Sequence, residues 1–179
     1  MLIRNGCVTL RAIEESDLEL LHIMINEPDI ENMTGGWNPA IGRMEKKQWM
    51  ASYKNTDKNM RLMIELTNGK TIGMIMLTDI DWKNRKAAMG FKLHASAEDR
   101  IKGDLYDASA GIVEYAFNEL GMNRLEGYIV DDNVFSIKMS KKLGFQQEGI
   151  LRERIYKGGR YHDQIILALL KKDYQNKQI

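Results

Sequence analysis

The chain has 179 residues, of which 44% are hydrophobic and 28% charged, and these values predict a single domain over residues 1–179 with one sizeable core. Its 26 lysines and arginines nearly balance its 25 aspartates and glutamates, and a net charge of +1 argues against a bulk binder of nucleic acid or membrane surfaces. The single cysteine excludes an internal disulfide. We find no signal peptide and no long apolar run, and therefore expect a cytoplasmic protein.

The first third of the chain predicts one strand and two helices. Residues 8–13 fit a strand, and Ser16 or Asp17 is placed to cap a helix whose apolar positions recur at three- and four-residue spacing. Pro28 prevents this helix from continuing, because proline lacks the amide hydrogen that a helix interior needs. The glycines and proline of residues 35–39 indicate a loop, and residues 44–53 predict a second helix.

Three strand patterns follow, in residues 61–66, 71–81 and 86–94. The Asn-Gly pair at 68–69 is a strong tight-turn signal between the first two, and a short polar connection joins the second to the third. Such short connections predict an antiparallel meander. Gly90 lies inside the third strand, where it either makes a bulge plausible or simply accommodates a neighbouring side chain.

The second half of the chain predicts two helices, each followed by strand patterns. Residues 104–120 give the best helix of the chain, with apolar side chains on one face, and Gly121 ends it before a strand at 124–130. Asn133 is suited to cap the next helix, because its side-chain oxygen can accept from the free amides of the first turn. Gly144 supplies the left-handed turn that ends this helix, and two final strands form a closing hairpin.

These elements predict an α/β chain of the α+β kind, with a single mixed, mostly antiparallel sheet flanked by helices. The meander and the final hairpin are antiparallel, and a strand-helix-strand crossover adds a parallel pair. Helices are expected on both sides of the sheet. We find no linker that would divide the chain, no repeat and no low-complexity tract.

The segment between the third meander strand and the long helix is expected to bind a phosphate group. A glycine-bearing turn at a helix start, here with Gly103, presents backbone amides at the positive end of the helix dipole, where they can hold a pyrophosphate. Acids outnumber bases in residues 98–107. We expect an exposed Asp104 to weaken this binding without abolishing it, because two charges about 4 Å apart in water repel by only ~1 kcal/mol.

The most informative segment of the chain is residues 133–149. It consists of an asparagine, a short helix, the run Lys-Leu-Gly-Phe at 142–145 and then a Glu-Gly pair. This segment resembles the coenzyme-A-binding end of the GNAT superfamily of N-acetyltransferases. The continuation through 152–163 and the opening at 8–18 resemble the branch that acetylates ribosomal-protein N-termini and amino sugars, and the resemblance runs from about residue 8 to residue 174.

The resemblance implies a GNAT-like acyl-CoA acyltransferase fold and an enzyme that moves an acetyl group from acetyl-CoA to a primary amine. The amine would belong to a small molecule such as an amino sugar, or to a protein N-terminus, and would attack the thioester directly in a ternary complex. Residues 100–105 resemble the family's Arg/Gln-x-x-Gly-x-Gly/Ala signature for phosphate binding, and a backbone amide near residue 91 resembles its oxyanion donor. The residues implied to bind acetyl-CoA are Phe91, Arg100, Ile101, Lys102, Gly103, Asp104, Leu105 and Asn133.

Acetyl transfer needs a proton for the departing thiolate. Ser140 stands where many relatives have a tyrosine that protonates the sulfur, and Ser136 aligns with a serine that some members of the branch are thought to use. Each hydroxyl can hydrogen-bond a thiolate or relay a proton from water. Each serine is equally well explained as a small residue that lets the helix pack closely against the sheet.

The general base is open, because Ala88 stands where relatives often carry a glutamate that acts through water. An amine is almost fully protonated at neutral pH, so some group must remove a proton before it can attack. The better two candidates are Glu126, on the strand beside the expected thioester cleft, and His162. The other three candidates are Asp79, Asp81 and Glu153.

Aromatic side chains offer the expected acceptor surface. Trp37, Trp82 and Tyr156 lie on predicted loops or strand ends, where a sugar ring or a peptide can stack. The sequence supplies no strong basic groove for a nucleotide, so a ribosomal-protein N-terminus and a polyamine stay open as acceptors. We expect no metal, because the three histidines are scattered and there is no cysteine pair, and a homodimer is left open.

Leu105 departs from the family pattern, which has glycine or alanine where the backbone comes close to the phosphates. With Ala88 and Ser140, it supports an alternative reading. In that alternative the chain is a catalytically degenerate relative that binds an acyl-CoA or a protein partner.

Overall fold

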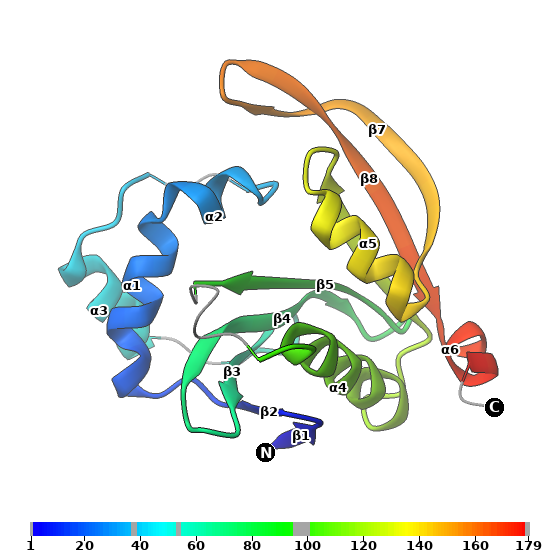
Figure 1. The fold of residues 1–179 in the computed structure, drawn as a ribbon, viewed down its shortest axis with the longest axis horizontal. Helices are drawn as coiled ribbons and strands as arrows, with labels where there is room; N and C mark the ends of the chain where they lie inside the picture. The colour runs from blue at the N-terminus through cyan, green and yellow to red at the C-terminus, as the bar shows by residue number, and fades with distance from the viewer. Residues whose placement is uncertain (1, 37–38, 53–54, 95–100, 178–179) are drawn as a thin grey trace.

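An eight-stranded sheet forms the centre of the protein (Figure 1). The computed structural model describes residues 2–36, 39–52, 55–94 and 101–177. The strands are β1 Ile3–Asn5, β2 Val8–Arg11, β3 Met60–Leu66, β4 Thr71–Asp81, β5 Lys86–Leu93, β6 Arg124–Val130, β7 Gln146–Lys157 and β8 Arg160–Leu170. The helices are the 3₁₀ turn η1 Glu15–Asp17, α1 Leu18–Asn26, α2 Pro28–Asn32, α3 Arg43–Ser52, α4 Asp104–Asn118, α5 Val134–Leu143 and α6 Lys171–Lys177.

The strands lie in the order β1-β2-β3-β4-β5-β6-β8-β7, and among them only β5 and β6 pair in parallel. The first five strands form a meander, α4 crosses from β5 to β6, and α5 leads from β6 to the hairpin of β7 and β8. A parallel pair needs a long crossover, which α4 supplies. The expected single mixed, mostly antiparallel sheet flanked by helices is confirmed.

Helices cover both faces of the sheet (Figure 1). On one face, Ile112 of α4 and Leu143 of α5 pack into one cluster with Ile64 of β3. On the other face, Leu21 of α1 packs with Met63 of β3. Successive residues of a strand point to opposite faces of the sheet, so the two clusters lie on opposite faces. We call the face covered by α4 and α5 the α4 face, and the face covered by α1 and α3 the α1 face.

β5 and β6 separate after a short parallel stretch. Their register runs from Lys86 with Arg124 to Ala88 with Glu126, while β5 continues to residue 93 and β6 to residue 130. Beyond this point β5 is held by β4 and β6 by β8. Two strands that part in this way can present backbone amides and carbonyls to a ligand lying between them.

The predicted bulge at Gly90 is wrong. Gly90 keeps an unbroken register opposite Met76 of β4. The irregularity between these two strands lies at Thr78 and Asp81, where the intervening Asp79 has a φ of 50°. A strand glycine permits a bulge but does not require one, because the extended conformation is also open to it.

The helix ends that frame the predicted site are confirmed. The side-chain oxygen of Asn133 accepts from the amide of Ser136 at 3.0 Å and caps α5, and Gly144 ends α5 with a left-handed φ of 107°. Gly103 precedes α4 with a φ of 97°, a conformation that favours glycine. As predicted, α1 does not continue through Pro28: it ends at Asn26, and Pro28 is the first residue of α2.

The start of α1 differs from the predicted cap. Ser16 lies within η1, and the side chain of Asp17 does not cap α1. The buried carboxylate of Asp17 instead accepts from Nη1 and Nη2 of Arg11 at 2.7 and 2.8 Å, and from the amide of Glu14 at 2.8 Å. Arg11 also donates to Glu65 of β3 at 2.6 Å. A buried carboxylate needs such partners, so tertiary ion pairing takes the place of local capping.

Three short elements, β1, α2 and α6, lie outside the predicted ones. β1 has three residues, α2 five and α6 seven, and segments this short carry little periodic signal. No helix formed by the described residues is both long and apolar enough to cross a bilayer.

Candidate functional site

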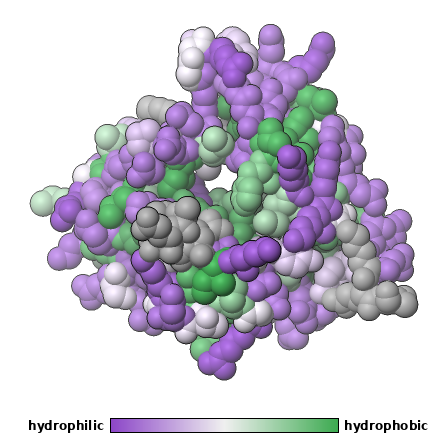
Figure 2. Space-filling view, viewed as in Figure 1, coloured by the Kyte–Doolittle hydropathy of each residue, from purple (hydrophilic) through white to green (hydrophobic). Residues whose placement is uncertain are grey.

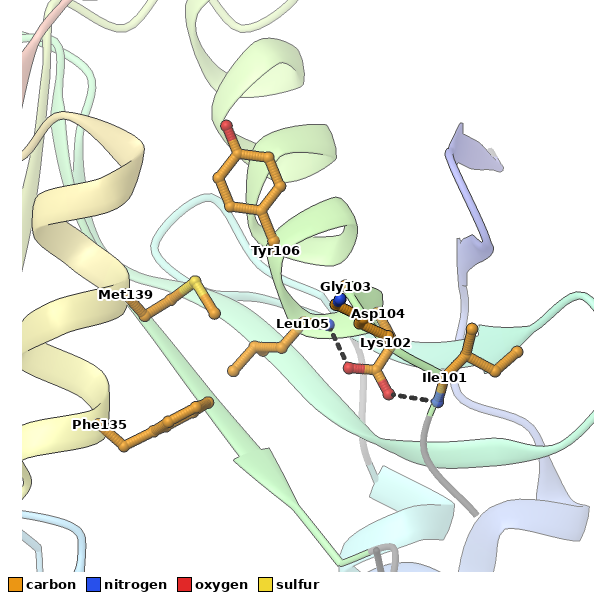
Figure 3. Close-up of a pocket in the computed structure, with 8 residues that line it drawn as sticks. All are labelled: Ile101, Lys102, Gly103, Asp104, Leu105, Tyr106, Phe135 and Met139. Carbon is orange, nitrogen blue, oxygen red and sulfur yellow. Dashed lines mark hydrogen bonds between the residues drawn. The ribbon is translucent and has the colours of Figure 1, made fainter. Parts of the chain in front are cut away.

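A cavity of about 400 Å³ opens beside the first turn of α4 (Figure 3). It is lined by the turn before α4, the start of that helix and α5, through Ile101, Lys102, Gly103, Asp104, Leu105, Tyr106, Phe135 and Met139. Residues 101–105, which were predicted to bind the cofactor, are thus brought together in one cavity. Arg100, predicted to belong with them, lies outside the described residues.

One wall of the cavity is apolar. Figure 3 shows the side chain of Leu105 pointing toward Phe135 and Met139 of α5. Leu105 is 1% exposed, whereas Phe135 is 57% exposed. The leucine that departs from the family pattern is therefore part of the packed contact between the two helices, and the exposed phenylalanine forms the outer edge of the wall.

Asp104 is buried, and the expectation of an exposed carboxylate is wrong. Its two oxygens accept from the amide of Leu105 at 2.5 Å and the amide of Ile101 at 3.2 Å (Figure 3). A carboxylate at a helix N-terminus is stabilised by the free amides and the helix dipole there, which is why it turns inward. Asp107 also turns away from the cavity, because it accepts from the amide of Cys7 at 2.9 Å.

Ser136 and Ser140 lie one turn apart on the buried side of α5. The amide of Ser136 is used by the cap from Asn133, and the carbonyl of Ser140 accepts from Gly144 and Phe145 at 3.1 and 3.0 Å. Asn133 also donates from Nδ2 to the carbonyl of Met33 at 3.0 Å, which ties the start of α5 to the end of α2.

Glu126 lies beside Ala88, at the last pair of residues before β5 and β6 part. Its neighbour Leu125 packs into the core of the α4 face, so the side chain of Glu126 points to the α1 face. A carboxylate is therefore present next to the position where relatives carry one on the adjoining strand. Phe91 lies three residues further along β5, in the part that β6 no longer accompanies.

Three donors surround the Glu126 carboxylate. Nε of Arg124 lies at 2.8 Å, the hydroxyl of Tyr128 at 3.0 Å and Nζ of Lys86 at 3.4 Å. Burial alone would raise the pKa of Glu126, but the hydrogen bonds from Arg124 and Tyr128 and the charge of Lys86 outweigh it and hold the pKa below its ordinary value. Glu126 is consequently an ionised acceptor at neutral pH. Arg124 extends the network to Glu148 of β7 at 2.5 and 2.8 Å.

His162 lies far from Glu126. Glu126 pairs with Ala168 of β8, and His162 precedes Ala168 by six residues, a separation of roughly 20 Å along an extended strand. His162 is buried, and its Nδ1 lies 3.2 Å from both Asp131 and Asp132. The structure therefore does not bring the two preferred base candidates to one centre.

The cluster of Asp131, Asp132 and His162 offers oxygen and nitrogen atoms within 4.8 Å of one another, a spacing that also suits a metal ion. The cation that Asp132 holds in this structure is Arg160, whose Nη2 lies at 2.6 Å. Hydrogen bonding to His162 and to two backbone amides lowers the pKa of Asp131 against the opposing effect of burial. The cluster is thus satisfied by ion pairing between the end of β6 and the start of β8.

The remaining base candidates serve turns and bulges. Asp81 accepts from the amide and the side chain of Asn84 at 2.9 and 2.6 Å, and these bonds lower its pKa. Asp79 and Glu153 each have a positive φ, at 50° and 51°, where β4 and β7 slip in register.

Of the aromatic residues predicted for the acceptor, the two described ones, Trp82 and Tyr156, are not brought together. Trp82 lies in the turn before β5, near the end of β5 that pairs with β6. Its ring nitrogen donates to the carbonyl of Asp57 at 2.5 Å. Tyr156 is near the tip of the β7–β8 hairpin, where it makes an edge contact with Tyr161 at 5.0 Å between ring centroids. Trp37 lies outside the described residues.

An opening separates α2 from α5 on the face shown in Figure 2, with hydrophobic residues on part of its border. Side chains from the second half of the chain form hydrogen bonds to α2 and its C-terminal end near this opening. Besides the Asn133 bond, Nζ of Lys157 lies 3.1 Å from the carboxylate of Glu31 and also donates to the carbonyl of Glu31. Sequence reasoning missed Lys157 and Glu31, because they are 126 residues apart and no local pattern relates them.

The chain matches the acetyltransferase (GNAT) domain family over residues 8–146. YdaF of Bacillus subtilis (strain 168), to which a ribosomal N-acetyltransferase activity is attributed, is 29% identical over 183 aligned positions that cover 97% of each chain. The spermidine N(1)-acetyltransferase of Vibrio cholerae is 25% identical over 175 aligned positions, which cover 97% of this chain and 98% of that one. A crystal structure of the Vibrio cholerae spermidine N-acetyltransferase in complex with CoA and spermine has a TM-score of 0.86 at 24% identity, with 96% of this chain and 100% of that chain covered.

Proposed function

Because the chain belongs to the acetyltransferase (GNAT) domain family, we propose that it transfers the acetyl group of acetyl-CoA directly to a primary amine within a ternary complex. The chain is an N-acetyltransferase with acetyl-CoA as its co-substrate, as the family match and the named relatives indicate. The enzyme class implied by the resemblance is thereby confirmed.

The cavity at the start of α4 is the proposed site for the pyrophosphate and the adjoining chain of acetyl-CoA. Gly103 places a turn with no side chain at the positive end of a 15-residue helix, which favours an anion. Lys102 adds a positive side chain to the lining. The apolar wall of Leu105, Phe135 and Met139 suits the alkyl and amide chain that carries the thioester.

The observation that carries the proposal is the parting of β5 and β6 beside Glu126. The thioester chain would pass from the α4 face between the two strands, where backbone amides of β5 around Phe91 can donate to the carbonyl oxygen. The amine would reach the same point from the α1 face, to which Glu126 points. Cofactor and acceptor thus meet from opposite faces of the sheet.

The proposed chemistry uses Glu126 as the base. An ammonium loses one proton through a bridging water to the Glu126 carboxylate, and the neutral amine nitrogen attacks the thioester carbon. As the carbon–nitrogen bond forms and the carbon–sulfur bond breaks, the nitrogen gives up a second proton to become a neutral amide, and the departing thiolate of CoA takes that proton. Ser140 or Ser136 on α5 would hydrogen-bond this thiolate.

The proposed acceptor is a primary amine of a small molecule such as an amino sugar, or a protein N-terminus. The relatives carry names that point to a ribosomal substrate in one case and to spermidine in another. One fold serves many amines, so the names alone do not choose among these acceptors.

Initial rates of CoA release, measured while acetyl-CoA and an amine are varied together, test the proposal. Direct attack in a ternary complex predicts reciprocal plots that intersect, and one acetylated amine for each CoA released. Parallel plots together with an acetylated protein would show a covalent intermediate instead.

A second candidate function is binding of an acyl-CoA without efficient catalysis. Its supporting observation is that Asp104 already occupies the amides of Ile101 and Leu105, which a phosphate would otherwise use. Acetyl-CoA that binds in calorimetry and is not turned over with any amine would favour this candidate over the first.

A further inference from the structure

Four cations gather on the α1 face of the sheet and at its junction with α2. Lys46 is on α3, Arg61 on β3, Lys92 on β5 and Lys157 at the end of β7. We refer to these four residues as the basic cluster. They are far apart in the sequence, and no sequence pattern points to any of them.

The strand register places Arg61 and Lys92 on the same face. Each is flanked by residues that pack into the core of the α4 face, so both side chains point to the α1 face. Arg61 pairs with Met76 of β4, and Lys92 pairs with Met74 of the same strand. The two cations are therefore two strand spacings apart across the sheet and two residues apart along it, so their Cα positions are roughly 12 Å apart.

Lys46 belongs to α3, which packs on the α1 face of the sheet. Its Nζ lies 3.8 Å from the centroid of the Trp49 ring, and Trp49 packs with the hydrophobic cluster of the α1 face. Lys46 is only 6% exposed, yet among the described residues no carboxylate lies within ion-pair distance of its ammonium. A buried ammonium without a carboxylate is unfavourable unless a ligand compensates it.

The charges of the cluster act on one another. Burial lowers the pKa of Lys46 to about 8, and the charges of Lys92 and Arg61 contribute to this shift. Burial also lowers the pKa of Lys92, with Lys157 and Arg61 contributing and Glu31 opposing. Of the described groups whose charges act on Lys46 or Lys92, Glu31 is the single carboxylate, and it is already bonded to Lys157 at 3.1 Å.

We propose that the basic cluster binds an anionic group of the acceptor, a carboxylate or a phosphate, and so selects amines that carry such a group. The inference rests on the proposed acetyl transfer, since it names the class of amine that this site takes. The cluster and the α4 cavity lie on opposite faces of the sheet, so the phosphates of acetyl-CoA do not account for it. The bond between Lys157 and Glu31 places one end of the cluster at the junction that borders the opening in Figure 2.

The same charges disfavour a polyamine. A molecule such as spermidine would bring several positive charges toward the basic cluster, where Glu31 is the single carboxylate among the described groups whose charges act on Lys46 or Lys92. Like charges oppose binding, most strongly where water is partly excluded. The expected acceptor therefore differs from the one named for the Vibrio cholerae relative.

Two matched pairs of amines test the proposal through kcat/KM for CoA release. Glucosamine and glucosamine 6-phosphate differ by a phosphate, and 1,5-diaminopentane and lysine differ by a carboxylate, so the pairs also separate the two sources of anion. We expect the anionic member of at least one pair to be preferred by about tenfold or more, as hydrogen bonds to a charged group allow. Spermidine should be the poorest acceptor of the panel.

Lys92→Met and Lys46→Met link any preference to the cluster. Each substitution keeps a long side chain and removes the charge, and each should reduce the preference by about tenfold while the amine without an anion changes by less than about twofold. Lys83→Met, in the exposed turn before β5, is the matched control and should leave the preference unchanged.

Binding of glucose 6-phosphate, which has no amine, separates this inference from the proposed function. Calorimetric binding that is lost in Lys92→Met supports the anion site even if no amine is acetylated, in which case the proposed function alone fails. Turnover with equal kcat/KM for both members of each pair, or a preference for spermidine, overturns the anion site and leaves the acetyl transfer standing. Absence of glucose 6-phosphate binding, together with equal kcat/KM for lysine and 1,5-diaminopentane, also counts against it.

Discussion

At the scale of single residues, Lys46 carries a charge into a nearly closed environment, and its protonation is coupled to folding. Its pKa is about 8 in the folded protein, below its ordinary 10.5, because burial penalises the charged form and Lys92 and Arg61 repel it. Between these two values the unfolded chain binds more protons than the folded one. Stability should therefore rise as the pH rises from about 8 toward 10.5.

Lys46→Met should be more stable than the native protein at pH 7, and the difference should shrink by pH 10. The reason is that the native lysine must be charged at pH 7 in a site that disfavours the charge. Urea unfolding at both pH values measures this, with Lys47→Met on the exposed side of α3 as the control. A difference that stays constant between the two pH values would contradict the assigned environment.

The ionised carboxylate of Glu126 stabilises the folded protein, whereas the charge of Lys46 destabilises it. Its pKa is lowered in the folded protein, so the stability that it contributes is present above its ordinary value of 4.5 and is lost as the pH falls through the folded pKa. At neutral pH it stays ionised and able to accept a proton through water. The rise of activity with pH should then follow deprotonation of the amine and not of Glu126.

Glu126→Gln should lower kcat by about 100-fold, the lower end of what a general base contributes. Glu148→Gln is the matched control, because Glu148 shares Arg124 with Glu126 but lies exposed on β7. Equal losses in the two variants would assign the effect to the Arg124 network, and a loss below about twofold in Glu126→Gln would exclude it as the base.

Glu126 could be named from the sequence, whereas the basic cluster could not. The strand at 124–130 was predicted with its observed bounds, and Glu126 was a base candidate because of its place on that strand. Lys46, Arg61 and Lys92 each look like an ordinary charged position in its own segment. Only the strand register and the packing of α3 on the sheet bring them together.

At the scale of elements, the turn before α4 is the proposed holder of the cofactor's pyrophosphate. The glycine-bearing turn there was predicted, and the left-handed φ of 97° at Gly103 explains why a residue without a side chain is favoured. The burial of Asp104 could not be predicted, because it depends on the amides of Ile101 and Leu105 converging on one carboxylate.

Gly103→Glu should weaken acetyl-CoA binding by at least about tenfold, since it adds a negative charge where the pyrophosphate is proposed to lie. Gly103→Ala meets the same backbone strain without the charge and should weaken binding far less. Calorimetric titration of the three proteins with acetyl-CoA makes the comparison. Equal weakening by both substitutions would mean that strain, and not an anion, explains the loss.

The attachment of α1 to the sheet depends on the ion pairs of Arg11. Arg11→Met would leave Asp17, which is 4% exposed, without its charged partner, and should cost about 3–5 kcal/mol of unfolding free energy. Urea unfolding measures the loss. Arg4→Met on β1, where the side chain is exposed, should fall within about 0.5 kcal/mol of the native protein. A loss below about 1 kcal/mol in Arg11→Met would show that the pair adds little.

This pair also explains why the predicted side-chain cap of α1 does not form, although Asp17 stands at the N-cap position. Ser16 and Asp17 have the right chemistry for a local cap, but Asp17 finds a better partner in an arginine on β2. Asn133 has no such competitor, and its predicted cap forms. Local signals thus held where no tertiary ion pair intervened.

At the scale of the whole molecule, the two proposed binding regions lie on opposite faces of the sheet that contains the parting of β5 and β6. The α4 face carries the apolar cavity with its glycine turn, and the α1 face carries the basic cluster. The sheet topology was predicted from strand patterns and turn lengths together with the family resemblance. The opening between α2 and α5 was not, because it is bordered by segments that meet only after folding.

The most direct test of acetyl transfer is a single-turnover measurement with enzyme in excess over acetyl-CoA. Mass spectrometry would follow the acetyl group in the presence of glucosamine 6-phosphate and lysine as acceptors. We predict that the acetyl group moves from CoA to the amine, with equal amounts of CoA and acetylated amine formed and none without an amine. Acetyl-CoA that is bound yet stays intact with every amine would contradict the transferase and leave a binding protein.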